Sequence, residues 1–170
     1  IFVTEEKHMH IALIIHSQTG NTLSVAEKMK ENLVALGHQV TLEKVEASND
    51  EEVDATKVVL TSVPKIKYAD AYIFGAPVRG FMLSAVMRSY LEQSDSLLDK
   101  PTICFLTQYF PFKWMGGNNA MKQFKEILSR KAGHIIASHN INWSAKKKRP
   151  KQIEEAVRSV ELLLNKLTLS

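Results

Sequence analysis

The sequence predicts an α/β domain with a doubly wound parallel sheet and helices on both of its faces. Short apolar runs with the length of buried strands, such as 11–15 and 102–106, alternate with segments whose apolar residues recur at helical spacing. This alternation favours a parallel sheet, because each helix returns the chain to the edge where the next strand begins. The 170 residues carry 45% hydrophobic and 24% charged side chains, which suits one domain with a sizeable core.

The expected elements follow in chain order. The expected strands cover residues 11–15, 39–45, 71–74, 102–106 and 134–141. The expected helices have apolar faces within 22–36, 83–91, 121–128 and 153–167. Gly37 ends the first helix, Asn118 or Asn119 caps the third, and Pro150 begins the fourth. Between the second and third strands, 46–54 is expected as a loop or short helix and 57–66 as an extended piece.

The segment between the first strand and the first helix has the composition of an anion site. It consists of Ser17, Gln18, Thr19, Gly20, Asn21 and Thr22. Free backbone N–H groups and the positive end of the helix dipole converge at such a helix start, and hydroxyl groups add further donors. A helix cap needs one hydroxyl, so three of them favour a bound anion. Because the segment has no Lys or Arg, we expect a phosphomonoester there.

Two more loops follow strands at the same expected edge of the sheet, where doubly wound folds bind ligands. The loop 75–81 contains Pro77, Val78, Arg79, Gly80 and Phe81, and its two glycines around a proline suit close approach to a flat ligand. The loop that begins with Thr107, Gln108, Tyr109 and Phe110 contains four aromatic residues, which can stack on a planar ring. A phosphate on one loop and a ring between two others describe FMN.

The sequence resembles the flavodoxin-like FMN proteins from about residue 9 to the C-terminus. The segment 17–22 is similar to the phosphate loop of that family. The segment 75–80 is similar to the isoalloxazine loop of the tryptophan-repressor-binding-protein type quinone reductases, which has a Gly-x-Pro-x-Arg pattern. The resemblance implies a five-stranded sheet in the order 2-1-3-4-5 and bound FMN. Two features depart from the family: this chain is basic where carrier flavodoxins are acidic, and the loop after Thr107 lacks the Ser-Thr-Gly run of the quinone reductases.

We expect one flavodoxin-like domain over 1–170, with 1–8 a disordered or cloning-derived extension. The favoured function is an NAD(P)H-dependent quinone or flavin reductase. The alternatives are a non-catalytic flavodoxin electron carrier and a flavin-free interaction domain on the same fold. The expected partners are NAD(P)H or a redox-protein donor and a quinone or flavin acceptor, and the oligomeric state, including a homo-oligomer, is left open. No residue qualifies as a catalytic acid or base, because the redox chemistry belongs to the flavin.

Other functions known for such folds need residues that these loops lack. A phosphoacceptor receiver domain requires acidic residues after the first strand, and a low-molecular-weight tyrosine phosphatase requires Cys and Arg in the first loop. No nucleotide-binding motif with Gly-Lys-Ser/Thr or Gly-x-Gly-x-x-Gly is present. The six histidines form no recognisable metal set, and Cys104 between apolar neighbours is expected to be an inert core thiol.

The net charge of +4 is unevenly distributed along the chain. Residues 113–170 carry 12 basic and 4 acidic side chains, and the densest run is 146–151. Such a run can mark a nucleic-acid or membrane surface, but no aromatic residues are interleaved in it. We therefore expect a solvated loop and no nucleic-acid partner. No apolar segment approaches the roughly 20 residues of a membrane span, and a single cysteine suits a reducing compartment, so we expect a cytoplasmic protein.

Overall fold

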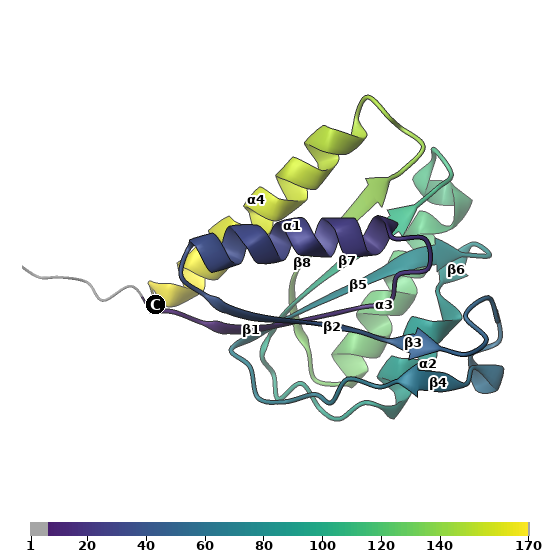
Figure 1. Ribbon diagram of the computed structural model, residues 1–170, viewed down its shortest axis with the longest axis horizontal. Coiled ribbons are helices and arrows are strands. Elements are labelled where there is room, and N and C mark those ends of the chain that lie inside the picture. The colour runs from purple at the N-terminus through teal and green to yellow at the C-terminus, as the bar shows by residue number, and fades with distance from the viewer. Residues whose placement is uncertain (1–6, 170) are drawn as a thin grey trace, which may run out of the picture.

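The computed structural model describes residues 7–169, and its centre is a twisted sheet between two layers of helices (Figure 1). Most of the N-terminal extension expected over 1–8 lies outside the described residues. Five parallel strands lie in the order β2 (Gln39–Lys44), β1 (His10–Ile15), β5 (Ala71–Arg79), β7 (Pro101–Gln108) and β8 (His134–Asn142). Counted among themselves, these strands have the predicted order 2-1-3-4-5, so the predicted fold class is confirmed.

Two helices cover each face of the sheet. On one face lie α1 (Asn21–Ala35) and α4 (Arg149–Thr168), and on the other lie α2 (Ala85–Gln93) and α3 (Asn118–Arg130) (Figure 1). Each helix buries a stripe of apolar residues at spacings of three and four, such as Ile153, Ala156, Val160 and Leu164 of α4. The sheet therefore separates two hydrophobic cores, one beneath each pair of helices.

The middle of the chain adds short elements to this frame. The two-stranded antiparallel pair of β3 (Glu46–Ala47) and β4 (Leu60–Ser62) lies between β2 and β5 in the chain, with the 3-10 turn η1 (Ala55–Lys57) between its strands. The expected extended piece within 57–66 thus corresponds to β4. After β5 comes the short antiparallel strand β6 (Met82–Leu83), and a π-type turn η2 (Lys113–Gly117) leads into α3.

Three predicted boundaries are wrong. The third strand, expected over 71–74, continues to Arg79, because β7 pairs with it as far as Pro77 and β6 pairs with its last two residues. The fourth strand likewise extends to Gln108. Neither Asn118 nor Asn119 caps α3 with its side chain, because η2 runs directly into that helix.

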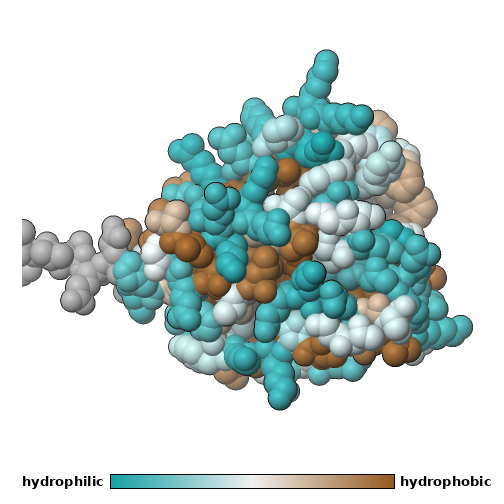
Figure 2. All heavy atoms as spheres, in the orientation of Figure 1, coloured by the Kyte–Doolittle hydropathy of each residue, from teal (hydrophilic) through white to brown (hydrophobic). Residues whose placement is uncertain are grey.

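The surface agrees with a globular domain. Hydrophilic side chains cover most of the face seen in Figure 2, and apolar groups form smaller patches between them. Among the helices of residues 7–169, none combines the length and the apolar character needed to cross a membrane.

Candidate functional site

A cavity of about 220 Å³ lies at the carboxyl edge of the sheet, next to the point where the strand order reverses between β1 and β5. Its walls come from the β1–α1 loop and from the ends of β5, β7 and β8. The lining residues are Gln18, Thr19, Asn21, Thr22, Pro77, Val78, Arg79, Thr107, Gln108, Tyr109 and Trp143. Ten of the fifteen residues predicted to form a ligand site thus line one cavity, and their role in binding stays a prediction.

The start of α1 offers free backbone donors to this cavity. The N-cap residue Gly20 has a left-handed backbone (φ 91°) and provides no side-chain cap. The Ser17 hydroxyl accepts a hydrogen bond from the Leu23 N–H at 3.1 Å, so Ser17 supports the helix start and does not line the cavity. Within the described chain, the N–H groups of Asn21 and Thr22 have no acceptor. Such unpaired first-turn donors suit an anion.

The side chains of the same loop have three different environments. Thr22 is buried, and its hydroxyl pairs with the Thr107 hydroxyl at 2.8 Å, which fastens the loop to β7. The side-chain oxygen of Gln18 is buried without a hydrogen-bond partner in the described chain. Thr19 is exposed at the rim. Three hydroxyls in this loop therefore do not form one donor set, since Ser17 and Thr22 already have partners within the protein.

The β5–β6 hairpin forms a second wall. Pro77, Val78 and Arg79 line the cavity, whereas Gly80 and Phe81 turn the chain at the hairpin tip with positive φ angles of 56° and 61°. The tip does not line the cavity; the Phe81 ring stacks on the Phe110 ring, with centroids 5.7 Å apart and an interplanar angle of 10°.

The end of β7 is held by the side chain of Gln108. Its amide nitrogen donates to the carbonyl oxygens of Phe110 (2.6 Å) and Phe112 (2.9 Å), and its amide oxygen accepts from Asn140 at 2.7 Å. These bonds shape the aromatic loop that follows. Of the four aromatic residues in that loop, only Tyr109 lines the cavity. Phe112 and Trp114 stack on each other and do not line it.

The cavity residue that sequence reasoning missed is Trp143. It follows the last strand directly, and its N–H donates to the Gln108 carbonyl at 2.7 Å, while its ring packs under the Arg149 guanidinium at 4.7 Å. The available signal was a tryptophan immediately after a strand of the parallel sheet, because the carboxyl ends of all such strands lie at one edge.

Directly after β1, His16 connects three segments. Its Nδ1 lies 2.9 Å from the Ser84 hydroxyl, and its Nε2 lies 2.6 Å from an Asp50 carboxylate oxygen. Burial lowers the pKa of His16, the hydrogen bond and charge of Asp50 oppose that shift, and the charge of Arg79 adds to it. The residue types Ser84, His16 and Asp50 are those of a nucleophile triad. However, Ser84 is only 1% exposed, and its hydroxyl caps α2 by accepting from the Met87 N–H. Its role is therefore structural.

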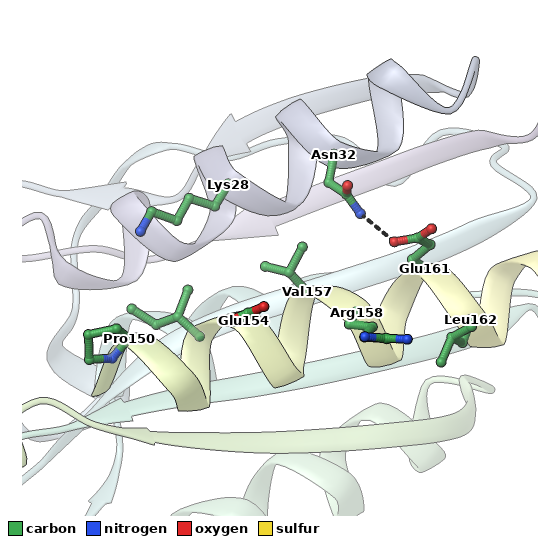
Figure 3. Close-up of a pocket in the computed structure, with 9 residues that line it drawn as sticks. Lys28, Asn32, Pro150, Glu154, Val157, Arg158, Glu161 and Leu162 are labelled. Atoms are coloured by element: carbon green, nitrogen blue, oxygen red, sulfur yellow. Dashed lines mark hydrogen bonds between the residues drawn. The ribbon is translucent and has the colours of Figure 1, made fainter. Parts of the chain in front are cut away.

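A larger cavity of about 570 Å³ lies elsewhere, between α1 and α4 (Figure 3). Charged groups of both signs border it, including Lys28, Glu154 and Arg158, and Asn32 donates to Glu161 across it at 3.1 Å. None of its lining side chains is a buried polar group without a partner. It is a groove between two helices, and within the described chain it lacks the converging hydrogen-bond donors found in the carboxyl-edge cavity. The described residues also contain no group of His, Cys, Asp and Glu that could hold a metal ion.

Comparison with known proteins finds likeness at the level of structure. No protein-family model and no curated protein matches the chain. The flavodoxin of Streptococcus pneumoniae TIGR4 has a TM-score of 0.60 and 16% identity, over 88% of this chain and 95% of that chain. Oxidised flavodoxin 2 of Bacillus cereus has a TM-score of 0.59 and 22% identity, over 89% and 98%.

A third similar structure contains a cofactor. It is a flavoprotein from Lactobacillus acidophilus NCFM in complex with FMN, with a TM-score of 0.56 and 16% identity over 84% of this chain and 99% of that chain. At these identities the similarity establishes the fold and leaves the function to the chemistry of the site.

Proposed function

We propose, from the premise that this chain has the flavodoxin-like fold, that its carboxyl-edge cavity binds FMN and that the protein is a flavin-dependent reductase. The substrate class is a quinone or a flavin, and the electrons come from NAD(P)H or from a redox protein. Bound FMN would supply the one- and two-electron transfers. The chain's residues would bind and orient it and set the charge around its ring.

The observation that carries the proposal is the coincidence of unpaired donors and an unpaired acceptor in one cavity. The free N–H groups of Asn21 and Thr22 and the exposed Thr19 hydroxyl suit a phosphate at the start of α1. The buried, unpartnered oxygen of Gln18 suits a hydroxyl donor such as those of a ribityl chain. FMN contains both the phosphate and the ribityl hydroxyl groups that these donors and this acceptor suit.

The neighbouring walls suit a planar ring. Pro77 and Val78 present half-buried apolar surface at the end of β5, and Tyr109 and Trp143 add aromatic side chains from β7 and β8. The FMN of the Lactobacillus acidophilus flavoprotein supports the same ligand class for this fold.

Charge favours a reductase over a low-potential carrier. Arg79 lines the cavity and Lys113 belongs to the loop beside it, while the segments 17–22, 75–81 and 107–119 contain no Asp or Glu. Positive charge stabilises a reduced, anionic ring and therefore raises its potential. When the potential for adding the second electron rises toward that of the first, electrons are transferred in pairs, as two-electron reduction of a quinone or flavin requires. The alternative, a one-electron carrier, is supported by the likeness to the two flavodoxins.

The test is a titration of the purified protein with FMN, riboflavin and FAD, followed by absorbance and flavin fluorescence. We expect FMN to bind at least about tenfold more tightly than riboflavin, because charge-assisted hydrogen bonds to a phosphate contribute about 1.5–3 kcal/mol. Equal affinity for FMN and riboflavin would contradict the phosphate assignment.

The second measurement distinguishes reductase from carrier. The FMN-loaded protein is mixed with NADH or NADPH and a quinone, and its reduction potentials are determined by absorbance. Turnover with a quinone supports the reductase. A very low potential without NAD(P)H oxidation with any quinone would decide for the carrier.

A further inference from the structure

Five aromatic rings that face solvent belong to the two chain segments that follow the cavity-lining ends of β5 and β7. Phe81, Tyr109, Phe110, Phe112 and Trp114 are all exposed, and Tyr109 and Trp114 expose 71% and 74% of their surface. They come from the β5–β6 hairpin tip and from the loop after β7, two segments that the Phe81–Phe110 stack joins. Exposed large rings scattered singly need no explanation, but three rings connected by contacts and a stacked pair in the loop after β7 mark an interaction site.

The ring cluster is ordered by contacts within the protein. Phe112 stacks on Trp114 with centroids 5.8 Å apart and an interplanar angle of 8°, and Tyr109 meets Phe110 edge to face. Gln108 holds the carbonyl oxygens of Phe110 and Phe112 from below. A surface that is fixed before binding loses little side-chain freedom when a partner docks.

A basic run lies at the same edge of the sheet. Asn142, at the end of β8, donates to the Pro111 carbonyl of the aromatic loop at 2.7 Å, and the basic run follows four residues later. Lys146, Lys147 and Lys148 are exposed, and within the described chain none of them forms an ion pair. The segment 140–151 contains no Asp or Glu. The basic run thus begins four residues after a direct contact with the aromatic loop.

We propose that this aromatic–basic surface, made of the five rings with Arg79, Lys113 and Lys146–Lys148, docks an acidic electron-transfer protein. The proposal rests on the proposed function, since it names the redox-protein donor or acceptor of the same site. Protein interfaces concentrate aromatic residues at their centre and arrange complementary charge around them. Unpaired lysines without neighbouring carboxylates select an acidic partner.

The position of the surface adds the functional reason. Arg79 and Tyr109 belong both to the surface and to the lining of the cavity, so a protein docked there lies directly against the proposed FMN site. A single-stranded nucleic acid is a weaker match, because four of the five rings already stack on one another and offer fewer free faces to bases.

The experiment uses titration calorimetry to measure how tightly the protein binds an acidic plant-type [2Fe–2S] ferredoxin. The measurement is made with and without FMN and at low and high salt. We expect salt-sensitive binding. The variant K146E/K147E/K148E should weaken it at least about tenfold and flatten its salt dependence. Trp114→Ala should weaken it about tenfold with the salt dependence retained, as for an aromatic anchor.

The matched control reverses three exposed lysines outside the aromatic–basic surface. Lys7 precedes β1, Lys65 and Lys67 precede β5, and all three are exposed. K7E/K65E/K67E should change the affinity less than about twofold. Equal losses in both triple variants would overturn the docking surface, because net charge alone would then explain them. Absence of ferredoxin binding would overturn it too, as would loss of binding to a single-stranded oligonucleotide alone in K146E/K147E/K148E.

FMN affinity and reduction by a small chemical reductant are measured for each variant. Failure to bind FMN would count against the proposed function, whereas normal FMN binding with salt-insensitive ferredoxin binding would count against the docking surface alone.

Discussion

Thr19, in the β1–α1 loop, and Thr22, in the first turn of α1, are three positions apart but have different surroundings. Thr22 is buried against Thr107, and Thr19 is exposed at the rim of the cavity. The sequence presents them as equal hydroxyl donors, because the partner of Thr22 lies 85 residues further along the chain. Their substitution therefore separates the contribution of a side chain to the ligand from its contribution to the fold.

We expect Thr19→Val to weaken FMN binding by about 1–3 kcal/mol and to leave the free energy of unfolding of the apo-protein nearly unchanged. Thr22→Val leaves the Thr107 hydroxyl buried without its partner, so it should also destabilise the apo-protein by about 1–3 kcal/mol. Flavin titration and urea unfolding of each variant measure the two effects. Thr41→Val, on the exposed side of β2, is the matched control and should change neither.

Histidines that are wholly or partly shielded from water make the stability depend on pH. Burial lowers the pKa of His139 below its ordinary value of 6.5, and burial is also the largest influence on His16. Because the unfolded chain then binds more protons than the folded one, stability is fully present above pH 6.5 and is lost as the pH falls below it.

Urea unfolding at pH 7.5 and pH 5.5 should therefore show lower stability at pH 5.5. His139→Gln should reduce the difference between the two pH values, and His134→Gln, at an exposed position, should not. A difference that is the same in all three proteins would assign the pH dependence to other groups.

At the scale of the elements, the sequence predicted the centre of every parallel strand and missed ends that depend on pairing. The apolar runs identify 71–74 and 102–106, but β5 reaches Arg79 only because β6 folds back onto it. Local composition contains no information about that partner. For the same reason the composition of 75–81 predicts a loop around the ligand, although most of it is strand and only its hairpin tip turns.

The candidate site shows the same division. Residues that line the cavity from the ends of β1, β5 and β7 were predictable, because parallel strands place their carboxyl ends together. The roles of Ser17 as a cap and of Gln108 as the support of the aromatic loop depend on contacts across the fold. Sequence spacing therefore predicts most residues of the cavity but does not assign the contacts of each side chain.

Gln108 offers a test of one element. Gln108→Ala removes two hydrogen bonds to the aromatic loop and one from Asn140, so we expect a loss of about 1–3 kcal/mol and faster cleavage by chymotrypsin within 109–114. Gln152→Ala, which removes one bond to the Asn142 N–H, is the control and should leave cleavage in that loop unchanged. Unaltered cleavage in both variants would mean that the ring stacks alone hold the loop.

At the scale of the whole molecule, one sheet serves both hydrophobic cores. Ile103 and Phe105 of β7 point into the core under α1 and α4, whereas Cys104 and Leu106 point into the core under α2 and α3. Neither core can lose its helices without exposing a face of the shared strands. The domain should therefore unfold in one step.

Cys104 makes this measurable. Its thiol is fully buried, and burial raises its pKa to about 12, so a thiol reagent should not react with the folded protein. Its labelling should appear at the same urea concentration as the loss of circular dichroism. Ser48→Cys, at an exposed position, should react in the folded state. Labelling of Cys104 before the dichroism changes would reveal separate opening of the α2–α3 side.

The register between β1 and β5 also affects how the chain reaches this structure. Ile11 pairs with Ala71, so during synthesis β1 lacks its β5 partner until 60 further residues have been made. Until then β1, α1 and β2 have one sheet edge open and apolar faces uncovered, and closing so long a loop delays productive contacts. On the ribosome, an N-terminal fragment that ends before β5 should recruit chaperones or aggregate. Refolding from urea should be slower than that of a helical bundle of equal length, which stopped-flow fluorescence can measure.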